Sequence, residues 1–299
     1  MRWTEEQVPA LTGKTFLVTG ANSGLGFETT RALAGKGAHV IMAVRNLAKG
    51  EAARARVEGS TEIRQLDLAD LDSVRALARA LHDEGRTIDV LVNNAGVMMP
   101  PRALSAQGHE LQFAANHLGH FALTLLVLDL VAERVVTVSS GLHRGGRIHY
   151  EDLDGAKQYN RQAFYSQSKF ANVLFGLELH RRLRAAGDPR RSLLAHPGYS
   201  ATNLQLSGPT GALRTFMRMG NAMLAMPAAQ GALNILYAAT EPGAESGQFI
   251  GPDGLREFRG WPGIVPPDPK ATDEADAARL WTLSEQLADV QLSGADLRR

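Results

Sequence analysis

Near the N-terminus, a short apolar run leads directly into a glycine-rich turn, and the turn leads into a segment with helical spacing. The run is Thr15 to Thr19, and the turn is Gly20-Ala21-Asn22-Ser23-Gly24-Leu25-Gly26. Such glycines let the backbone bend tightly and approach a diphosphate, whose charge then faces the helix N-terminus. The spacing is Gly-x-x-x-Gly-x-Gly, which differs from the usual dinucleotide fingerprint Gly-x-Gly-x-x-Gly. The arrangement still predicts a strand–turn–helix unit that binds a dinucleotide.

Buried strands alternate with helices along the rest of the chain. We expect further strands at Ala38 to Val44, Ile63 to Leu66, Ile88 to Val92, Arg134 to Ser139, Ser192 to Ala195 and Gln248 to Ile250. The longest helices are expected at Gly108 to Val131 and Asn160 to Ala186. This alternation predicts an α/β fold of the Rossmann type, a doubly wound sheet of about seven parallel strands with helices on both faces. No linker or repeat is visible, so we expect a single domain over residues 1–299.

The composition excludes several classes of function. The formal net charge of +1 predicts no binding to nucleic acid. The absence of cysteine excludes disulfides, thiolate nucleophiles and cysteine-ligated metals. His117 and His120 have no carboxylate or further histidine at a spacing typical of a metal site, so we expect no metal. No secretory signal or membrane anchor is visible at the N-terminus, and a cytoplasmic protein is expected.

The residues at the strand ends indicate which cofactor is bound. Arg45-Asn46 follows the second strand, where an acid would bond a free ribose 2′-hydroxyl and an arginine would favour a 2′-phosphate. NADP(H) is therefore favoured over NAD(H), although Arg45 could also be an ordinary solvated arginine. Asp67, followed by Leu68, could accept from an adenine amino group or cap the next helix. Asn93-Asn94-Ala95-Gly96 allows close backbone approach to the nicotinamide-side ribose, or forms a simple turn.

Tyr165 and Lys169 lie four residues apart on an expected helix and so share one face. An ammonium held near a phenol lowers the pKa of the phenol, which could then exchange a proton near neutral pH. A surface pair on a helix is the alternative. Ser140, at the end of a strand, could donate a hydrogen bond to a substrate oxygen. Asn116, in an apolar helix, is either a structural bridge or part of a proton path.

Two later segments have roles outside this sheet. The segment 199–227 is rich in methionine and apolar residues, which is typical of a mobile lid over an apolar substrate, a core helix or a dimer contact. An amphipathic helix is expected at 273–289. Its Leu280, Trp281, Leu283 and Leu287 are expected to dock on the domain.

Over nearly its whole length the chain resembles the short-chain dehydrogenase/reductase family. The marks stand in the family's order: Thr19 to Gly26, Asp67, Asn93 to Gly96, Asn116, Ser140, Tyr165 with Lys169, and Pro197-Gly198 with Thr202. The resemblance implies a catalytic tetrad of Asn116, Ser140, Tyr165 and Lys169. In it, Tyr165 is the general acid or base, Ser140 polarises the carbonyl, Lys169 bonds the nicotinamide ribose and lowers the tyrosine pKa, and Asn116 anchors a water linked to Lys169.

The cofactor-binding residues expected on this basis surround the strand ends. They are Gly20, Asn22, Ser23, Gly24, Leu25, Gly26, Arg45, Asn46, Asp67, Leu68, Asn94, Ala95, Gly96, Tyr165, Lys169, Pro197, Gly198 and Thr202.

The insertion Gly145 to Arg161 and the run Asn116-His117-Leu118-Gly119-His120 are similar to the retinol-dehydrogenase-like branch. That likeness implies an NADP(H)-dependent oxidoreductase, such as a carbonyl reductase, acting on the carbonyl or alcohol of an apolar small molecule. It also implies a homodimer or homotetramer, since the family commonly pairs its two long helices across a dimer axis. A cofactor-binding regulator without turnover and a lyase or epimerase on the same scaffold are the alternatives.

Overall fold

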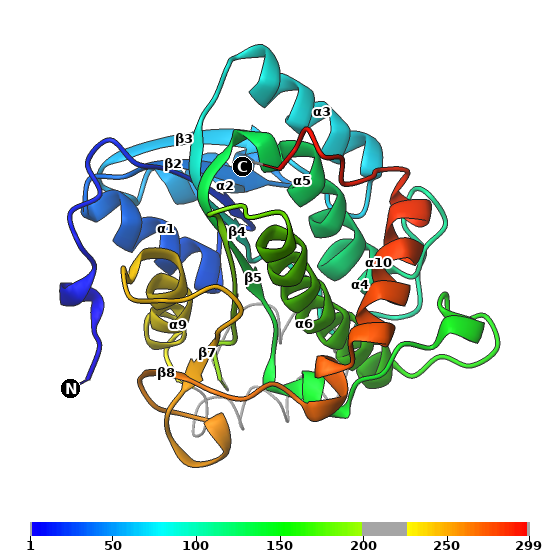
Figure 1. Cartoon of the computed structure of the whole chain (residues 1–299). Helices are drawn as coiled ribbons and strands as arrows, with labels where there is room; N and C mark the ends of the chain where they lie inside the picture. The colour runs from blue at the N-terminus through cyan, green and yellow to red at the C-terminus, as the bar shows by residue number, and fades with distance from the viewer. Residues whose placement is uncertain (1, 199–225, 298–299) are drawn as a thin grey trace.

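The computed structural model describes residues 2–198 and 226–297, and they form one eight-stranded sheet with helices on both faces (Figure 1). The strands are β1 Thr15–Thr19, β2 His39–Val44, β3 Ser60–Gln65, β4 Ile88–Asn93, β5 Val131–Val138, β6 Arg191–Ala195, β7 Phe249–Pro252 and β8 Pro262–Ile264. The helices are α1 Gly24–Gly35, α2 Leu47–Arg54, α3 Leu71–Asp83, α4 Leu111–Phe113, α5 Gly119–Val127, α6 Arg161–Ala185, α9 Ala228–Thr240 and α10 Glu274–Ala288.

The sheet order is β3-β2-β1-β4-β5-β6-β7-β8, and β1 to β7 are parallel. The predicted doubly wound fold and its seven parallel strands are confirmed. The strand order reverses direction between β1 and β4, and ligands of such sheets bind at this switch point. β8 is an additional, antiparallel strand paired with β7, and the sequence hides it because it lies in a proline-rich stretch.

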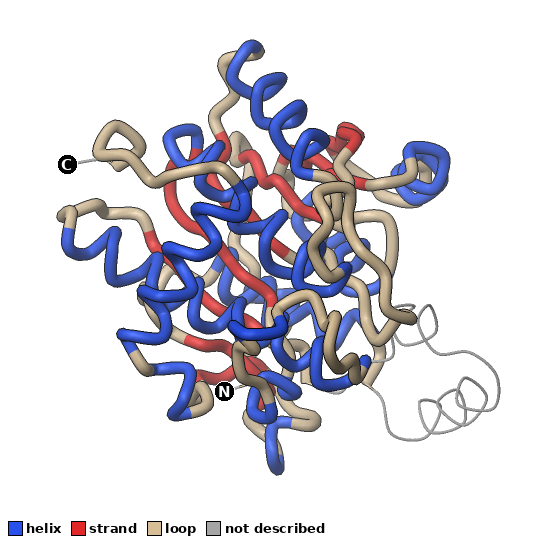
Figure 2. The backbone as a smooth tube through the Cα atoms, turned by 90° about the vertical axis from the view of Figure 1, so that its right-hand side faces the viewer, coloured by secondary structure: helices blue, strands red, loops and turns tan. Residues whose placement is uncertain are grey.

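Two hydrophobic clusters hold the layers together, one on each face of the sheet. One joins α1 and α9 to the sheet, with Phe16, Val18, Leu33 and Leu236 fully or almost fully buried. The other joins α3, α5 and α6, with Leu17, Leu81, Phe121 and Leu174. Figure 2 shows the strands in the middle of the molecule among these helices. Alternate residues of β1 therefore enter opposite clusters, as expected for a strand covered on both sides.

The long helix expected from Gly108 begins at Leu111 and is interrupted. A π-helical turn, Ala114–Leu118, separates α4 from α5, and Asn116 lies in its middle. Residues Leu111–Leu130 are long and apolar enough to cross a membrane, but 89% of the apolar window is buried inside the fold. Packing in the core accounts for this composition.

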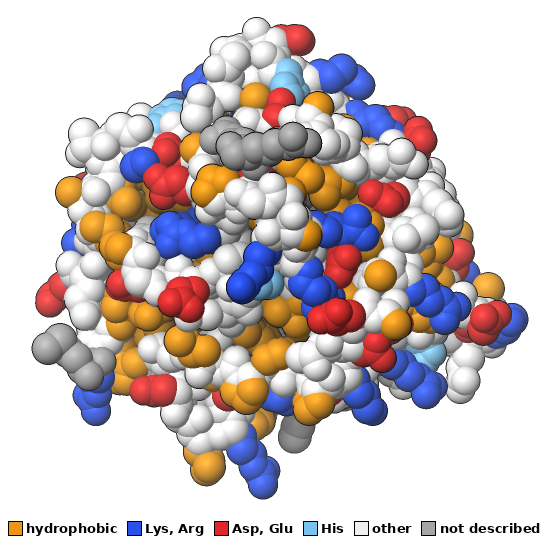
Figure 3. Space-filling model, viewed as in Figure 1, with side chains coloured by type: hydrophobic (Ala, Val, Ile, Leu, Met, Phe, Trp, Pro, Cys, Tyr) orange, Lys and Arg blue, Asp and Glu red, His pale blue; other side chains and the backbone are white. Residues whose placement is uncertain are grey.

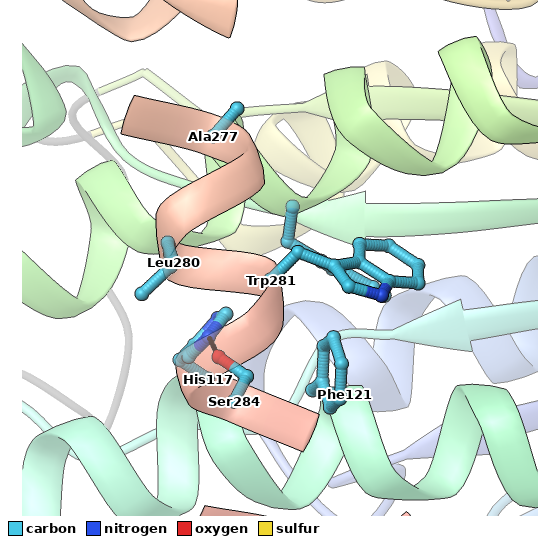
Figure 4. A pocket seen from close by; sticks show the side chains of 7 residues that line it. His117, Phe121, Ala277, Leu280, Trp281 and Ser284 are labelled. Atoms are coloured by element: carbon cyan, nitrogen blue, oxygen red, sulfur yellow. Dashed lines mark hydrogen bonds between the residues drawn. The ribbon is translucent and has the colours of Figure 1, made fainter. Parts of the chain in front are cut away.

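Helix α10 packs across α5 and α6 on the side away from the sheet (Figure 1). Trp281 lies between Phe121 and Phe175, with ring centroids 5.0 and 5.8 Å away, and the Arg182 guanidinium lies 4.3 Å from its ring. His117 contacts the Ser284 hydroxyl at 2.9 Å, and essentially no free volume remains in this seam (Figure 4). Of the four residues expected to dock, Leu280 and Trp281 are buried, whereas Leu283 and Leu287 are only partly covered.

Candidate active site

The glycine-rich turn after β1 is shaped by contacts that only glycine permits. Gly20 has a φ of +67° and Gly24 a φ of +55°, in the left-handed region that favours glycine. A Cβ at Gly26 would lie 2.4 Å from the Gly20 carbonyl oxygen and 2.5 Å from Nδ2 of Asn94. Ser23 precedes α1 without a side-chain capping bond, so the helix N-terminus is not closed by its own hydroxyl. The turn is a cradle suited to a diphosphate.

Asn94 and Ala95 fasten the end of β4 to this turn. The backbone N–H groups of both residues donate to Oγ1 of Thr19 at 2.9 Å, and Nδ2 of Asn94 donates to the Thr19 carbonyl oxygen at 2.8 Å. The end of β4 is therefore fixed against the end of β1 at the switch point. Asn22 and Leu25 lie in the same turn, between Gly20 and Gly26.

His120 joins Thr19 to the π-helical turn, and sequence reasoning did not assign it this position. Its Nδ1 donates to the Asn116 carbonyl oxygen at 2.9 Å, so Nε2 accepts from the Thr19 hydroxyl at 2.8 Å. Burial lowers the pKa of His120 to about 3, which keeps the ring neutral. The sequence feature that could have indicated this contact is the position of His120 four residues after Asn116, about one helical turn away.

Arg45 and Asn46 lie exposed at the end of β2. The Asn46 side chain accepts from the Lys49 N–H and caps α2, so it has a structural role in this structure. The Asp67 carboxylate accepts from the Ala69 N–H at 3.0 Å, and the helix cap of α3 is instead Asp70. Leu68 is buried against Gly119, where a Cβ would lie 2.3 Å from the Leu68 carbonyl oxygen.

Tyr165 and Ser140 meet at the end of β5. The Ser140 side chain accepts from the Leu142 N–H at 3.3 Å, and it also interacts with the Tyr165 phenol. Tyr165 is 4% exposed, and burial raises the pKa of its phenol to about 12, while the neighbouring Ser140 acts in the opposite direction. This shift is opposite to the lowered pKa that the Tyr–Lys spacing predicts, because the cost of burying a phenolate outweighs the effect of Ser140.

Lys169 is buried beneath Tyr165. Its Nζ lies 5.9 Å from the centre of the Tyr165 ring and donates to the Val138 carbonyl oxygen at 3.2 Å. Burial lowers the pKa of the Lys169 ammonium to about 8, because no carboxylate offsets the loss of hydration. Ser139, next to the expected catalytic serine, points inward and donates to the Lys169 carbonyl oxygen at 2.8 Å. Tyr165 and Lys169 are thus buried together rather than forming a surface pair.

Asn116 is a structural bridge in this structure. Its Oδ1 accepts from the Val97 N–H at 2.7 Å, and its Nδ2 donates to the Val97 carbonyl oxygen and the Ser168 hydroxyl, both at 2.9 Å. A Cβ at Gly96 would lie 2.9 Å from Oδ1 of Asn116 and 3.6 Å from Nζ of Lys169. Gly96 thereby lets the loop after β4 approach Asn116 and Lys169 closely.

Pro197 and Gly198 follow β6, and Gly198 has a φ of +66°. Thr202 and most of the segment 199–227 lie outside the described residues, as do all but the last residue of the methionine-rich run Leu213 to Met226. Within residues 2–198 and 226–297, no group of three or more histidine or acidic side chains could hold a metal ion.

A buried carboxylate that sequence reasoning missed, Glu110 at the start of α4, contacts the insertion before α6. Glu110 accepts from the Tyr159 hydroxyl at 3.0 Å and from the Phe113 N–H at 2.8 Å. Burial raises the pKa of Glu110, and Gln112 links Tyr159 to the Met99 N–H. This network fixes the loop after β4 to the insertion. The bonds join parts of the chain far apart in sequence, so no local pattern could have predicted it.

Comparison with known proteins agrees with this geometry. The profile of the short chain dehydrogenase family matches residues 14–208. Retinol dehydrogenase 14 of Mus musculus is 39% identical over 301 residues, which cover 93% of this chain and 86% of that protein. The chain belongs to the short-chain dehydrogenase/reductase family. Within the family it falls in the retinol-dehydrogenase-like branch, and it is an oxidoreductase.

Solved structures support the same assignment. An uncharacterized protein from Mycobacterium Paratuberculosis is 46% identical and superposes with a TM-score of 0.85. The match covers 98% of this chain and 100% of that protein. A protein from Beutenbergia cavernae, described as an NAD(P) dependent gluconate 5-dehydrogenase with bound NADP, is 26% identical with a TM-score of 0.62. It covers 80% of this chain and 95% of its own. Family members bind nicotinamide cofactors and act on small molecules.

Proposed function

We propose that this oxidoreductase transfers a hydride between NADP(H) and the carbonyl or alcohol of an apolar small molecule, with Tyr165 as the general acid or base. The observation that carries the proposal is the buried Tyr165 phenol, which lies with Ser140 and Lys169 at the carboxyl ends of the strands near the switch point. A buried, perturbed phenol at such a position is suited to proton transfer rather than to fold stability.

The glycine-rich turn fits a dinucleotide. The Gly20–Gly26 contact leaves no room for a side chain between the turn and the end of β4, so a diphosphate can approach the backbone of this turn. Gly20, Ser23 and Leu25 would hold the diphosphate, Asp67 the adenine, and Pro197 with Gly198 the nicotinamide side. When bound, the cofactor supplies or accepts the hydride.

Each of the four side chains of the proposed tetrad has its own role in the reaction. Ser140 donates a hydrogen bond to the substrate oxygen and orients it toward Tyr165. In reduction the Tyr165 hydroxyl gives its proton to that oxygen, and in oxidation the phenolate takes the proton back. Lys169, as an ammonium, stabilises the phenolate, while Asn116 holds the loop of Gly96 and Val97 against it. Burial of this group excludes water from the proton transfer.

The preference for NADP(H) rests on Arg45, which stands exposed at the end of β2 where a 2′-phosphate would lie. The relative from Beutenbergia cavernae holds NADP in the same fold. An apolar substrate is supported by the exposed side chains of Leu142, two residues after Ser140, and Phe258, whose carbonyl oxygen approaches Gly198. It is also supported by the retinol dehydrogenases among the relatives.

Titration of the pure protein with NADPH and with NADH, followed by fluorescence, tests the proposal. We expect NADPH to bind at least about tenfold more tightly, and Arg45→Asp to remove this preference, because it replaces an attraction to phosphate by a repulsion. Arg79→Asp on the exposed side of α3 makes the same charge change and should leave both affinities unaltered. Tighter binding of NADH by the unaltered protein would overturn the NADP(H) assignment. Binding of neither cofactor would overturn the proposed function.

A further inference from the structure

A cluster of Glu257, Arg144 and His196 joins three segments around the candidate site. Glu257, in the loop between β7 and β8, places Oε1 at 2.6 Å from Nη2 of Arg144 and Oε2 at 3.0 Å from Nε2 of His196. Arg144 lies in the short 3-10 helix Gly141–Gly145 that Ser140 caps. His196 is the residue immediately before Pro197 and Gly198. Glu257 therefore forms an ion pair with the segment of the serine and lies in close contact with the segment of the nicotinamide-side residues.

The backbone at Glu257 is held in an unfavourable conformation. Glu257 has a φ of +59° and Arg256 a φ of +52°, which residues with side chains rarely adopt. Such conformations persist only where surrounding contacts impose them, and they gather at functional sites. The conformation brings the Glu257 and Phe258 carbonyl oxygens over Gly198, where a Cβ would lie 3.1 and 2.8 Å from them. The loop between β7 and β8 thus lies directly on Gly198.

His196 is fully buried in a space made for it. A Cβ at Gly251 would lie 2.2 Å from Nε2 of His196, so only glycine at this point of β7 leaves room for the ring. Nδ1 of His196 accepts from the Gly198 N–H at 3.3 Å, which places the proton on Nε2, facing Glu257. The His196 ring thus connects the Glu257 carboxylate to the backbone of Gly198.

A second histidine completes the connection to Ser140. His143 donates from Nδ1 to the Ser140 carbonyl oxygen at 2.7 Å and accepts at Nε2 from the Asp268 N–H at 3.1 Å. His143 and His196 pack on Phe249, with ring centroids 5.3 and 5.1 Å away. The chain after β7 therefore contacts the segments around the site twice, at Glu257 before β8 and at Asp268 after it.

We propose that Glu257 is a positioning residue: through Arg144 and His196 it sets the distance between Ser140, which orients the substrate, and Gly198, which flanks the nicotinamide. This rests on the proposed function, since the two segments hold the two reactants only if hydride passes between them. Displacement of reacting groups by a fraction of an ångström slows transfer without weakening binding.

The test is Glu257→Gln in the full chain, with Glu84→Gln as the matched control. Glu84 likewise contacts two basic side chains, here Arg64 and Arg86 at 2.7 Å each, but at the end of α3 rather than in this cluster. We expect Glu257→Gln to lower kcat by about ten- to a hundredfold, with KM for NADPH and for the carbonyl substrate changed less than about twofold. The kinetic isotope effect measured with deuterated NADPH should be larger in Glu257→Gln than in the unaltered protein, because hydride transfer becomes slower.

Hydrogen exchange supplies a readout that needs no turnover. Glu257→Gln should speed exchange in the peptides containing Gly141–Gly145 and Gly198, whereas Glu84→Gln should not. Arg144→Gln, which removes the same ion pair from its more exposed side, should reproduce both effects if Glu257→Gln does not fold. Unchanged kcat and unchanged exchange in the variants would overturn the positioning role while leaving the proposed function intact. Failure of the unaltered protein to turn over any carbonyl would count against the proposed function, and the exchange data alone would then decide the positioning role.

Discussion

Tyr165 and Lys169 lie next to each other, but the Lys169 ammonium does not lower the pKa of the Tyr165 phenol as the spacing predicts. The spacing of Tyr165 and Lys169 predicts a lowered tyrosine pKa, yet burial raises the pKa of Tyr165 to about 12 and lowers the pKa of Lys169 to about 8. Each shift favours the uncharged form, because both groups lose hydration. Across the neutral range, the protonated phenol is therefore the resting form of Tyr165, which suits reduction.

We predict a different pH dependence for the two directions of the reaction. Reduction needs the phenol and the Lys169 ammonium, so its rate should stay level from pH 6 to 7, below the pKa values of both groups. Oxidation needs the phenolate, whose fraction rises up to about tenfold per pH unit below that pKa, so its kcat/KM should increase with pH. Tyr165→Phe should lower both rates by about a hundredfold or more and leave NADPH binding in place. An oxidation rate independent of pH, or a Phe variant with full turnover, would contradict the assigned role.

Buried neutral histidines make the stability of the fold depend on pH. Burial lowers the pKa of both His117 and His120 to about 3, far below the ordinary value of 6.5. A depressed folded-state pKa means that the stability is fully present above pH 6.5 and is lost as the pH falls toward 3, since only the unfolded chain takes up the protons. Each histidine can contribute a slope of up to about 1.4 kcal/mol per pH unit.

The measurement is urea unfolding between pH 7 and 4.5. His117→Phe retains an aromatic ring beside Phe121 and Phe175 but cannot titrate. Its free energy of unfolding should fall less steeply with decreasing pH than that of the unaltered protein. Equal slopes would show that His117 is protonated in the folded protein.

At the scale of the elements, the stability of the α10 seam depends on one side chain. Trp281 is 2% exposed and contacts Phe121, Phe175 and Arg182. Trp281→Ala should lower the free energy of unfolding by about 3–5 kcal/mol, because it removes a large buried side chain from a seam without free space. Thr282→Ala, on the exposed side of the same helix, should change it little. A small loss for Trp281→Ala in urea unfolding would mean that α10 is only loosely attached.

Most parallel strands could be predicted from their continuous apolar runs, and most helices from the helical spacing of apolar residues with a glycine, proline or capping residue at an end. Asn160 and Asp273, for example, each cap the helix that follows. The π-helical turn at Asn116 could not be predicted, since its apolar sequence continues a helix and the irregularity depends on tertiary contacts with Val97 and Ser168. β8 could not be predicted because Pro262 and Gly263 are poor strand formers. They form a strand only by pairing with the neighbouring β7.

The candidate site divides in the same way. Local patterns mark Gly20, Gly26, Ser140, Tyr165 and Lys169 as candidates, and the family resemblance implies their roles. Other residues of the site act through partners that are far away in the chain: Thr19, His120, Glu110 and Glu257. Thr19 and His120, for example, are 101 residues apart. Such contacts become visible only when the fold brings the strand ends together.

At the scale of the whole molecule, the surface and the α10 seam bear on association. In the face shown in Figure 3, basic and acidic side chains are interspersed, which gives no single-sign patch for a charged partner on that side. The family resemblance predicts pairing through the two long helices, but α10 of the same chain already covers parts of α5 and α6. A second copy could use this seam only by displacing Trp281 and Ser284.

We predict that α10 stays in its seam whatever the oligomeric state, and the absence of cysteine from the chain allows a direct test. Ser284→Cys places a nearly isosteric thiol in a fully buried position, and Thr282→Cys places one on the exposed side of the same helix. Light scattering gives the mass of each variant over a range of concentrations, and a thiol reagent reports access. Cys at position 282 should react at once, whereas Cys at position 284 should stay protected in every oligomer, because the seam admits no reagent while α10 is docked. If the protected thiol became reactive as the mass doubled, a second copy would have replaced α10, and pairing through α5 and α6 would be correct after all.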